Sequence, residues 1–518
     1  MPDVSHIASI QRKENSSAFL WKRDPMASHA ARVYNPAMLD ALPFEKIWQS
    51  LHGNSIASKG IIAFIHFLEK RLGGRFVYDA ARIPFGNQEL PDLLDLAEKF
   101  RAASIIKSYR PTPGFCDEPP IFSWIAEFAS SRTKENFSGG ASAHDERQAL
   151  TATLAEALER YLWLETTDYF VSPQRATTHE ISKSGQAILP ERFAGFSPEQ
   201  RTKNSRLTLA PDAEYLWVRG YSWTAGKNIW IPAQVVSGKH GGKNFSNKDS
   251  EPVIVAAITT GLATGPTLEF ALLNGALEII ERDALMITWL NQLSPPRIDL
   301  DAVQKGSASL AALLESCKRY RLGVEALRMP TDAPAYAVCA VVRDESDAGP
   351  PIEAGLRANR SLPHAIEGAL LEALRMRRNA RHRPQWDKQK KKENIYHTER
   401  VSYWNSRERA PLLDFLTQGP VSPHAPEEWE TDTLEKHLER IIRWCAEKGY
   451  ELASVPLTHS KRNASPWHTE MVVMPDLIPF HMDERYPYTF GNRLQSIPKK
   501  FGYTPRAKPF LSEPHPFA

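Results

Sequence analysis

The chain has 518 residues, of which 42% are hydrophobic and 24% are charged, as in an ordinary globular protein. Its 64 basic and 61 acidic residues give a net charge of +3, which argues against a protein built mainly to coat nucleic acid. Four scattered cysteines without a CxxC pair indicate neither a structural zinc site nor a disulfide framework. A chain of this length is expected to form two or three lobes.

The first thirty residues are polar and mixed in charge, so they lack the apolar core of a secretory signal. The sequence also has no run of about 18 apolar residues that could cross a membrane. We therefore expect a cytoplasmic protein without membrane association.

Residues 1–105 are predicted to form a helix-rich N-terminal accessory region. Apolar residues recur at helical spacing in Leu42–Gly53, Ser58–Gly74 and Leu90–Ala103. A proline-rich joint, YRPTPGFCDEPP, follows. The region could bind a leader peptide or a partner protein, or it could only support packing, and its sequence does not decide between these roles.

Residues 106–518 alternate between strand and helix patterns, which predicts a mixed α/β (α+β) domain. The expected elements are two strands around a turn in Ala213–Gly238, a short buried strand in Pro252–Ile258, a helix over 267–292, a strand in Ala335–Asp344 and a helix in His364–His382. The proline-rich tail after about residue 490 is predicted to be extended. The basic run Lys388–Glu393 is interpreted as a solvated charge cluster.

The segment TLAEALER, residues 153–160, sets two carboxylates and an arginine on one side of a predicted helix. Because a helix turns about 100° per residue, Glu156, Glu159 and Arg160 share one sector. The apolar side chains on the opposite side are Leu154, Leu158 and Tyr161.

A second segment, GALEIIER at residues 275–282, repeats the Glu-x-x-Glu-Arg pattern further along the chain. Asn274, Glu278, Glu281 and Arg282 form its narrow polar stripe. Nearly every other residue of this predicted helix is apolar, so the stripe is not part of a generously solvated surface.

Two interpretations compete for these motifs. They could be surface helices with i,i+4 salt bridges, each worth roughly 0.2–0.5 kcal/mol. The recurrence, the like charges at i,i+3 and the apolar surroundings favour a bound cation instead, because buried carboxylates without one are costly. Carboxylates suit Mg²⁺ and arginines suit phosphate, which predicts a Mg²⁺–nucleotide site between two helices. The sequence has no GxxxxGK[ST] and no GxGxxG after a strand, so carboxylates rather than a glycine-rich loop would hold the nucleotide.

The order of motifs around these segments resembles the YcaO family. The resemblance covers about residues 110–518, and the matching pieces together are more specific than any one alone. These pieces are Ser138–Tyr161, Trp217–Val236, Thr259–Ala284 and Gly355–Arg377.

The resemblance implies a mixed α/β fold that binds ATP and Mg²⁺ and activates peptide backbone amides. Family members in peptide natural-product pathways close Cys, Ser or Thr of a ribosomally made precursor onto the preceding carbonyl, which gives thiazoline or oxazoline rings. By this resemblance Glu156, Glu159, Glu278 and Glu281 would hold Mg²⁺ and ATP. Arg282, a candidate catalytic residue, and Arg160 would lie near the phosphates.

Three departures from the family pattern bear on how strongly ATP binds. Ser-Gly-Gly-Ala at 138–141 replaces a common Gly-Lys-Gly, and Ala152 stands where a serine is frequent. Phe270 occupies the position of a usual glutamate, although Glu269 precedes it directly. Both Glu-x-x-Glu-Arg motifs are intact, which favours an active ATP site.

The sequence ends in EPHPFA, residues 513–518. Azoline-forming members often end in Pro-x-Pro-x-Pro, and Pro514, Pro516 and Ala518 resemble this pattern with the last proline replaced. Alternating prolines favour a stiff extended segment. The resemblance implies that such a tail presents its carboxylate to the active site; the alternative is a frayed proline-rich end.

Alternative functions and partners follow from the same resemblance. External sulfide or a substrate amine as nucleophile would give a thioamide or an amidine, and a non-catalytic scaffold is a further alternative. The implied partners are the precursor peptide, a leader-binding protein resembling a ubiquitin-activating-type protein, a flavin dehydrogenase and a second copy of the chain, whereas nucleic acid is not expected. The sequence identifies neither the precursor nor the ring type.

Overall fold

The computed structural model describes a large part of the chain, and the described residues all lie within one compact unit, Lys59–Ala518. The predicted helices Leu42–Gly53 and Ser58–Gly74 and the charge cluster Lys388–Glu393 lie outside the described residues. The described residues are 77–78, 90–112, 114–115, 117–129, 136–165, 173–210, 212–238, 251–256, 258–347, 349–382, 395, 397–457, 465–507 and 510–517.

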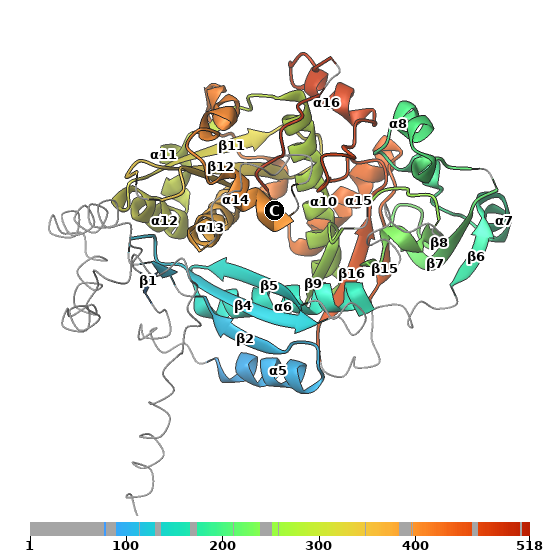
Figure 1. Ribbon diagram of the computed structural model, residues 1–518, viewed down its shortest axis with the longest axis horizontal. Coiled ribbons are helices and arrows are strands. Elements are labelled where there is room, and N and C mark those ends of the chain that lie inside the picture. The colour runs from blue at the N-terminus through green and yellow to red at the C-terminus, as the bar shows by residue number, and fades with distance from the viewer. Residues whose placement is uncertain are drawn as a thin grey trace, which may run out of the picture. The chain divides into compact units, whose positions relative to one another are not determined.

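The described strands form four sheets, and the two largest flank the longest helix (Figure 1). One has the order β6-β7-β15-β16-β9, with β8 also paired to β7, and every pairing is antiparallel. Its strands are β6 (Gln174–Thr177), β7 (Glu214–Ser222), β8 (Lys227–Pro232), β9 (Leu262–Gly265), β15 (Ala453–Pro456) and β16 (His468–Val473).

The other large sheet has the order β13-β12-β11-β10-β14, in which only β10 and β14 are parallel. Its strands are β10 (Arg297–Ile298), β11 (Leu322–Met329), β12 (Tyr336–Asp344), β13 (Ile352–Asn359) and β14 (Val421–Ser422). The smaller sheets contain β2 (Ser108–Pro111), β4 (Phe122–Ala129) and β5 (Asn136–Ala143), and separately β1 (Val77–Tyr78) and β3 (Gly114–Phe115).

Helix α10 (Leu268–Asn291) connects the two large sheets. The Thr267 side chain caps its start by accepting a hydrogen bond from the Phe270 N–H, and Gln292 ends it in the left-handed region with φ of 54°. Its first half packs on β9 and β16, and its second half packs on the β11–β13 side (Figure 1). Because both faces are covered, nearly all of its side chains are buried.

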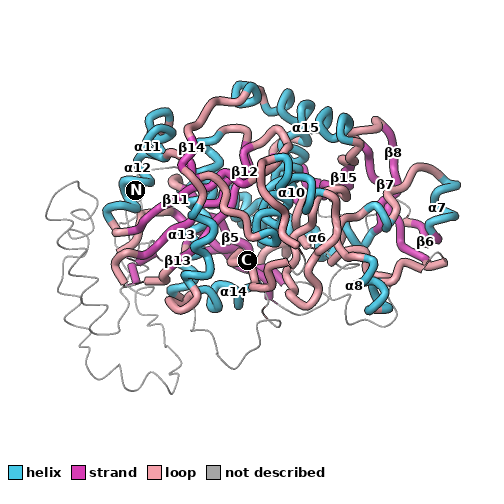
Figure 2. The backbone as a smooth tube through the Cα atoms, turned by 90° about the horizontal axis from the view of Figure 1, so that it is seen from above, coloured by secondary structure: helices cyan, strands magenta, loops and turns pink. Residues whose placement is uncertain are grey.

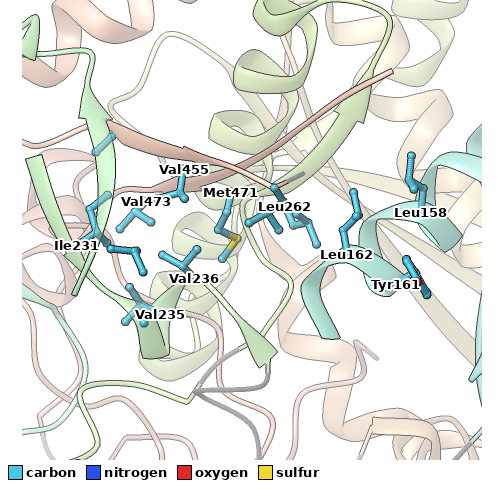
Figure 3. Close-up of a cluster of buried hydrophobic side chains, with 14 of the residues drawn as sticks. Leu158, Tyr161, Leu162, Ile231, Val235, Val236, Leu262, Val455, Met471 and Val473 are labelled. Carbon is cyan, nitrogen blue, oxygen red and sulfur yellow. The ribbon is translucent and has the colours of Figure 1, made fainter. Parts of the chain in front are cut away.

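Helix α6 (Glu146–Glu165) packs on β4, β5 and β9, and Asp145 accepts a hydrogen bond from the Gln148 N–H at its start. Leu158 and Leu162 enter a buried apolar cluster with Leu262 of β9 (Figure 3). The burial of Leu154, Leu158 and Tyr161 confirms the apolar side predicted for this helix.

Helix α13 (Leu362–Arg381) covers β12 and β13, as the view from above also shows (Figure 2). The remaining described α-helices are α5 (Pro91–Ala102), α7 (Thr178–Ser184), α8 (Pro198–Lys203), α11 (Leu300–Val303), α12 (Ala308–Arg319), α14 (His397–Trp404), α15 (Leu434–Lys448) and α16 (Arg493–Lys500). None of the helices in the described part of the chain has both the length and the apolar character needed to cross a membrane.

The predicted strand in Pro252–Ile258 is wrong. Val253 and Ile254 are fully buried, as the apolar run suggests, but the described part of this segment forms no strand. Its backbone donors bond outside any sheet: the Val253 N–H donates to the Arg206 carbonyl, the Ile254 N–H donates to the Gln234 amide oxygen, and the Ala256 N–H donates to the Tyr488 hydroxyl.

The tail after residue 490 is extended only in part, because α16 occupies Arg493–Lys500. Arg493, Leu494 and Ile497 of this helix are buried, so tertiary packing overrides the proline content of the tail. The described residues from 503 onward contain no helix or strand.

Candidate active site

The two Glu-x-x-Glu-Arg motifs meet at β9. Glu159 of α6 accepts a hydrogen bond from the Thr264 N–H at 2.6 Å, and Glu278 of α10 accepts one from the Gly261 N–H at 3.0 Å. Both glutamates therefore reach the same short segment, 261–264, from opposite helices. The fold thus brings the two motifs together, as predicted from the sequence.

All four glutamates share one arrangement, in which a backbone N–H from another segment holds one carboxylate oxygen. Glu156 accepts from Gly140 at 2.9 Å, and Glu281 accepts from Ala358 of β13 at 2.8 Å. Such hydrogen bonds orient a carboxylate, as the outer contacts of a metal ligand do. The second oxygen of Glu156 is already taken by the Arg160 guanidinium.

Burial and mutual repulsion set the charge state of the cluster. Burial, with the nearby charges of Glu156 and Glu278, raises the pKa of Glu159 well above its usual value. Burial likewise raises the pKa of Glu278 and of Glu281, although Arg282 opposes it. Carboxylates that resist ionisation in this way gain from an added cation.

Glu156 behaves differently because it has its own counterions. Burial raises its pKa, but Arg160 and Arg375 lower it further, so the pKa ends below its usual value. The Arg160 guanidinium lies 2.6 Å from the Glu156 carboxylate, which is the i,i+4 pair predicted for this helix.

Arg282 lies beside the cluster with unused hydrogen-bonding capacity. Its guanidinium is 3.8 Å from the Glu278 carboxylate and 3.7 Å from that of Glu281, and its Nε and Nη1 atoms are buried without a hydrogen-bond acceptor. A buried donor without an acceptor is costly, and phosphate oxygens would satisfy both atoms. The donor set of the site therefore fits a Mg²⁺–nucleotide.

The four glutamates do not form a tight group of ligating oxygens. Among the described residues, only His481, Glu484 and His515 place three metal-ligating atoms within 4.8 Å of one another.

Three charged residues at the site were not predicted. The charge of Arg357 on β13 acts on Glu278 and Glu281, and Glu372 of α13 raises the pKa of Glu281 by its charge. Arg375 of α13 donates to the Gly140 carbonyl beside Glu156. All three lie within the motif Gly355–Arg377, so the motif itself was the signal that could have identified them.

The structure shows what surrounds each residue that departs from the family pattern. In β5, a side chain at Gly139 would come within 3.3 Å of Glu156, so the glycines here allow a close approach of strand and helix. The Phe270 ring lies against Gly265, where even a single added carbon would clash at 2.1 Å. Ala152 is exposed on α6.

The tail segment 513–517 lies near Arg282. Pro514 and Pro516 are buried, and Ala518 lies outside the described residues. The centroids of the His515 and Phe480 rings are 4.5 Å apart. The Arg282 guanidinium carbon lies over the same Phe480 ring, 4.8 Å from its centroid. The structure thus connects the residue between the two prolines, His515, to Arg282 through the Phe480 ring.

The family model for YcaO cyclodehydratases, which bind ATP and Mg²⁺, matches residues 140–478, well over half of the chain. The protein therefore belongs to the YcaO family, and ATP and Mg²⁺ are its cofactors. The mixed α/β fold predicted from the sequence is confirmed.

Several known proteins are similar to this chain. A protein of uncharacterised function from Methanothermobacter thermautotrophicus is 24% identical over 225 residues, which cover 43% of this chain and 52% of that protein. A heterocyclase in complex with substrate and cofactor has a TM-score of 0.66 at 19% identity, covering 82% of this chain and 57% of its own. The matched region thus spans little more than half the length of these two relatives.

YcaO from Methanopyrus kandleri, bound with AMPPCP and Mg²⁺, has a TM-score of 0.54 at 19% identity over 78% of this chain and 94% of its own. The E. coli microcin synthetase McbBCD complex contains a chain with a TM-score of 0.54 at 14% identity, covering 79% and 96%. At these identities the similarity establishes the fold alone.

Proposed function

We propose that the protein is an ATP-dependent cyclodehydratase that closes Cys, Ser or Thr side chains of a ribosomally made precursor peptide to thiazoline or oxazoline rings. The observation that carries the proposal is the position of the Pro514–Pro516 segment, which is buried two ring contacts away from Arg282. Among the activities of the family, a proline-rich tail of this kind is associated with azoline formation. The tail therefore favours azoline formation over the formation of a thioamide or an amidine.

In this proposal Glu156, Glu159, Glu278 and Glu281 hold Mg²⁺ and ATP, which supply a neutralised phosphoryl group. Arg160 and Arg282 contact the phosphates. Pro514 and Pro516 keep the tail extended toward the site, and a role for Ala518 stays a prediction.

The substrate supplies its own nucleophile, so the protein contributes position and charge. The side-chain sulfur or oxygen attacks the preceding carbonyl carbon and loses its proton, and the resulting oxyanion takes the γ-phosphoryl group as ADP leaves. The ring nitrogen then loses its proton, the carbon–oxygen bond breaks, and phosphate departs to leave a carbon–nitrogen double bond. Arg282 would offset the negative charge on the transferring group.

The similar structures also support proposals about partners. One heterocyclase is in complex with substrate, and the microcin synthetase is a complex of several chains. We propose that this protein likewise acts on a peptide together with a leader-binding protein, and that a flavin dehydrogenase acts on the ring afterwards.

The test measures ADP release and the mass of synthetic peptides containing Gly-Cys, Gly-Ser and Gly-Thr pairs, with Mg²⁺–ATP present. A mass loss of about 18 Da per ring, the mass of one water, is expected from the wild type and not from Glu156→Gln or Glu278→Gln, in which a ligand carboxylate is lost. Full turnover in both variants would refute the assigned site. Incorporation of sulfur from added sulfide would indicate the thioamide reaction, and water loss that persists in peptides without Cys, Ser or Thr would indicate an amidine formed by a substrate amine. Absence of Mg²⁺–ATP binding by calorimetry would indicate a scaffold.

A further inference from the structure

Three consecutive carbonyl groups of the tail accept hydrogen bonds from buried side chains. The Trp289 indole N–H donates to the Glu513 carbonyl at 3.0 Å, and the Trp404 indole N–H donates to the Pro514 carbonyl at 3.1 Å. The Arg400 guanidinium donates to the His515 carbonyl at 3.0 Å. We call Trp289, Arg400 and Trp404 the tail clamp.

The tail clamp is built from rigid parts of the fold. Trp289 belongs to α10, Arg400 and Trp404 belong to α14, and all three side chains are at most 1% exposed. The two indole rings also contact each other edge to face at 6.3 Å. A frayed terminus would not be matched by three buried donors at successive carbonyls.

Two further contacts fix the histidine of the segment. The His515 Nε2–H donates to the His481 carbonyl at 2.7 Å, which defines its neutral tautomer. Its ring lies against Phe480, and the Arg282 guanidinium lies over the same Phe480 ring, 4.8 Å from its centroid. Because the ion pairs of Arg282 with Glu278 and Glu281 are 3.7 Å or longer and its Nε and Nη1 have no hydrogen-bond acceptor, the Phe480 ring is a further support of this side chain.

We propose that the tail clamp is a positioning device for Arg282. Trp289, Arg400 and Trp404 hold residues 513–515, the held His515 fixes Phe480, and Phe480 fixes the guanidinium beside the glutamates. The proposal rests on the proposed function, in which Arg282 acts on the transferring phosphoryl group. Helix α14 therefore serves the reaction without touching the substrate.

The test replaces Trp404 by Phe, which keeps a ring in the core and removes only the donor to Pro514. Hydrogen–deuterium exchange of residues 510–517 is expected to rise about tenfold, the effect of one lost buried hydrogen bond. The kcat for ADP release with Mg²⁺–ATP and the Gly-Cys, Gly-Ser and Gly-Thr peptides is expected to fall about tenfold, while Mg²⁺–ATP affinity changes less than twofold, because Arg282 acts mainly in the transition state. Trp289→Phe is expected to act in the same direction.

The matched control is Trp444→Phe in α15. The Trp444 indole N–H is buried without an acceptor, so this change removes a similar ring edge but no hydrogen bond. Both exchange and kcat should stay within twofold of the wild type.

The outcomes separate the two proposals. Faster exchange in Trp404→Phe with an unchanged kcat would show that the tail clamp only packs the tail, and unchanged exchange would show that it does not hold the tail; either result overturns the inference alone. A wild type that binds Mg²⁺–ATP but forms no ring in any peptide overturns the proposed function, and the positioning role falls with it.

Discussion

Two clusters of charged residues in this protein contain the same residue types, glutamate or aspartate with arginine, but differ in how closely the arginines approach the carboxylates. In the arginine cluster of α13, Arg381 forms two hydrogen bonds to Asp117 at 2.5 and 3.0 Å, and Arg378 pairs with Glu118. In the glutamate cluster of α6 and α10, Arg282 stays 3.7 Å or more from its carboxylates. The carboxylates of the first cluster have close arginine partners, whereas in the second cluster Glu156 has one, Arg160 at 2.6 Å, and Glu278 and Glu281 approach Arg282 no closer than 3.7 Å.

The pKa values follow the same division. Burial raises the pKa of Asp344, but its pair with Arg377 of the arginine cluster at 2.5 Å lowers it below the usual value. Burial and like charges raise the pKa of Glu159 instead. The difference between the two carboxylates is whether a close arginine supplies the countercharge, which favours a structural role for Asp344 and a binding role for Glu159.

The largest expected effect comes from breaking the arginine cluster. Arg381→Met would leave Asp117 buried without its partner and lower the free energy of unfolding by about 3–5 kcal/mol, measured by urea unfolding. Mg²⁺–ATP affinity of the folded protein should not change. Arg101→Met, which breaks an exposed pair with Glu98, is the control and should cost less than about 1 kcal/mol. Equal losses in the two variants would contradict the division between the clusters.

A change in the glutamate cluster should have the opposite balance. Because burial raises the pKa of Glu281, its ionised form opposes folding at neutral pH, and Glu281→Gln mimics the protonated form. The free energy of unfolding is expected to stay the same or to rise by about 1 kcal/mol, the scale of one pKa unit, while ATP turnover is lost. The control is Glu315→Gln at an exposed position of α12, which should alter neither the free energy of unfolding nor ATP turnover. A strongly destabilised Glu281→Gln would indicate that this cluster, too, is structural.

The smallest expected effect is a pH dependence of the tail. Burial and the charges of Arg400, His481 and Arg282 lower the pKa of His515 well below its usual value, and the neighbouring Glu484 is held by Arg400. His515 is therefore neutral while the tail is bound in its buried position, whereas in a released tail it binds a proton below about pH 6.5. Because protonation favours the released tail, the binding of the tail weakens as pH falls. Between pH 7 and 6 we expect the binding of the tail to weaken by about 0.7 kcal/mol, which lowers the protection of residues 510–517, measured relative to the intrinsic exchange rate at each pH, roughly threefold. His515→Gln should remove this pH dependence, and an unchanged slope would assign it to another group.

Local patterns predicted the principal helices and strands near the site well. The helices at 267–292 and His364–His382 match α10 and α13, and the two strands in Ala213–Gly238 match β7 and β8. These segments have long, regular patterns of apolar residues. The segment 252–258 was predicted wrongly because its Ile254 and Ala256 N–H groups donate to side-chain acceptors, Gln234 and Tyr488, that are distant in the sequence.

The same limit applies to the candidate site. Helical spacing placed each glutamate pair on one side of its helix, but spacing within a helix carries no information about which backbone N–H groups meet them. The contributions of Arg357, Glu372 and Arg375 depend on β13 and α13 packing beside α10. How the Phe270 ring affects nucleotide binding stays a prediction.

The four backbone donors that hold the glutamates have a consequence for folding. Gly140, Gly261, Thr264 and Ala358 belong to three different sheets or their edges, so the four carboxylates are oriented together only after all of these parts have assembled. The unfolded chain thus has no site for Mg²⁺–ATP, and any ligand bound only by the native state adds its binding energy to stability. At about 100 times its dissociation constant, Mg²⁺–ATP would add about 2.7 kcal/mol to the free energy of unfolding. The nucleotide concentration would then regulate how much of the protein is folded as well as how fast it works.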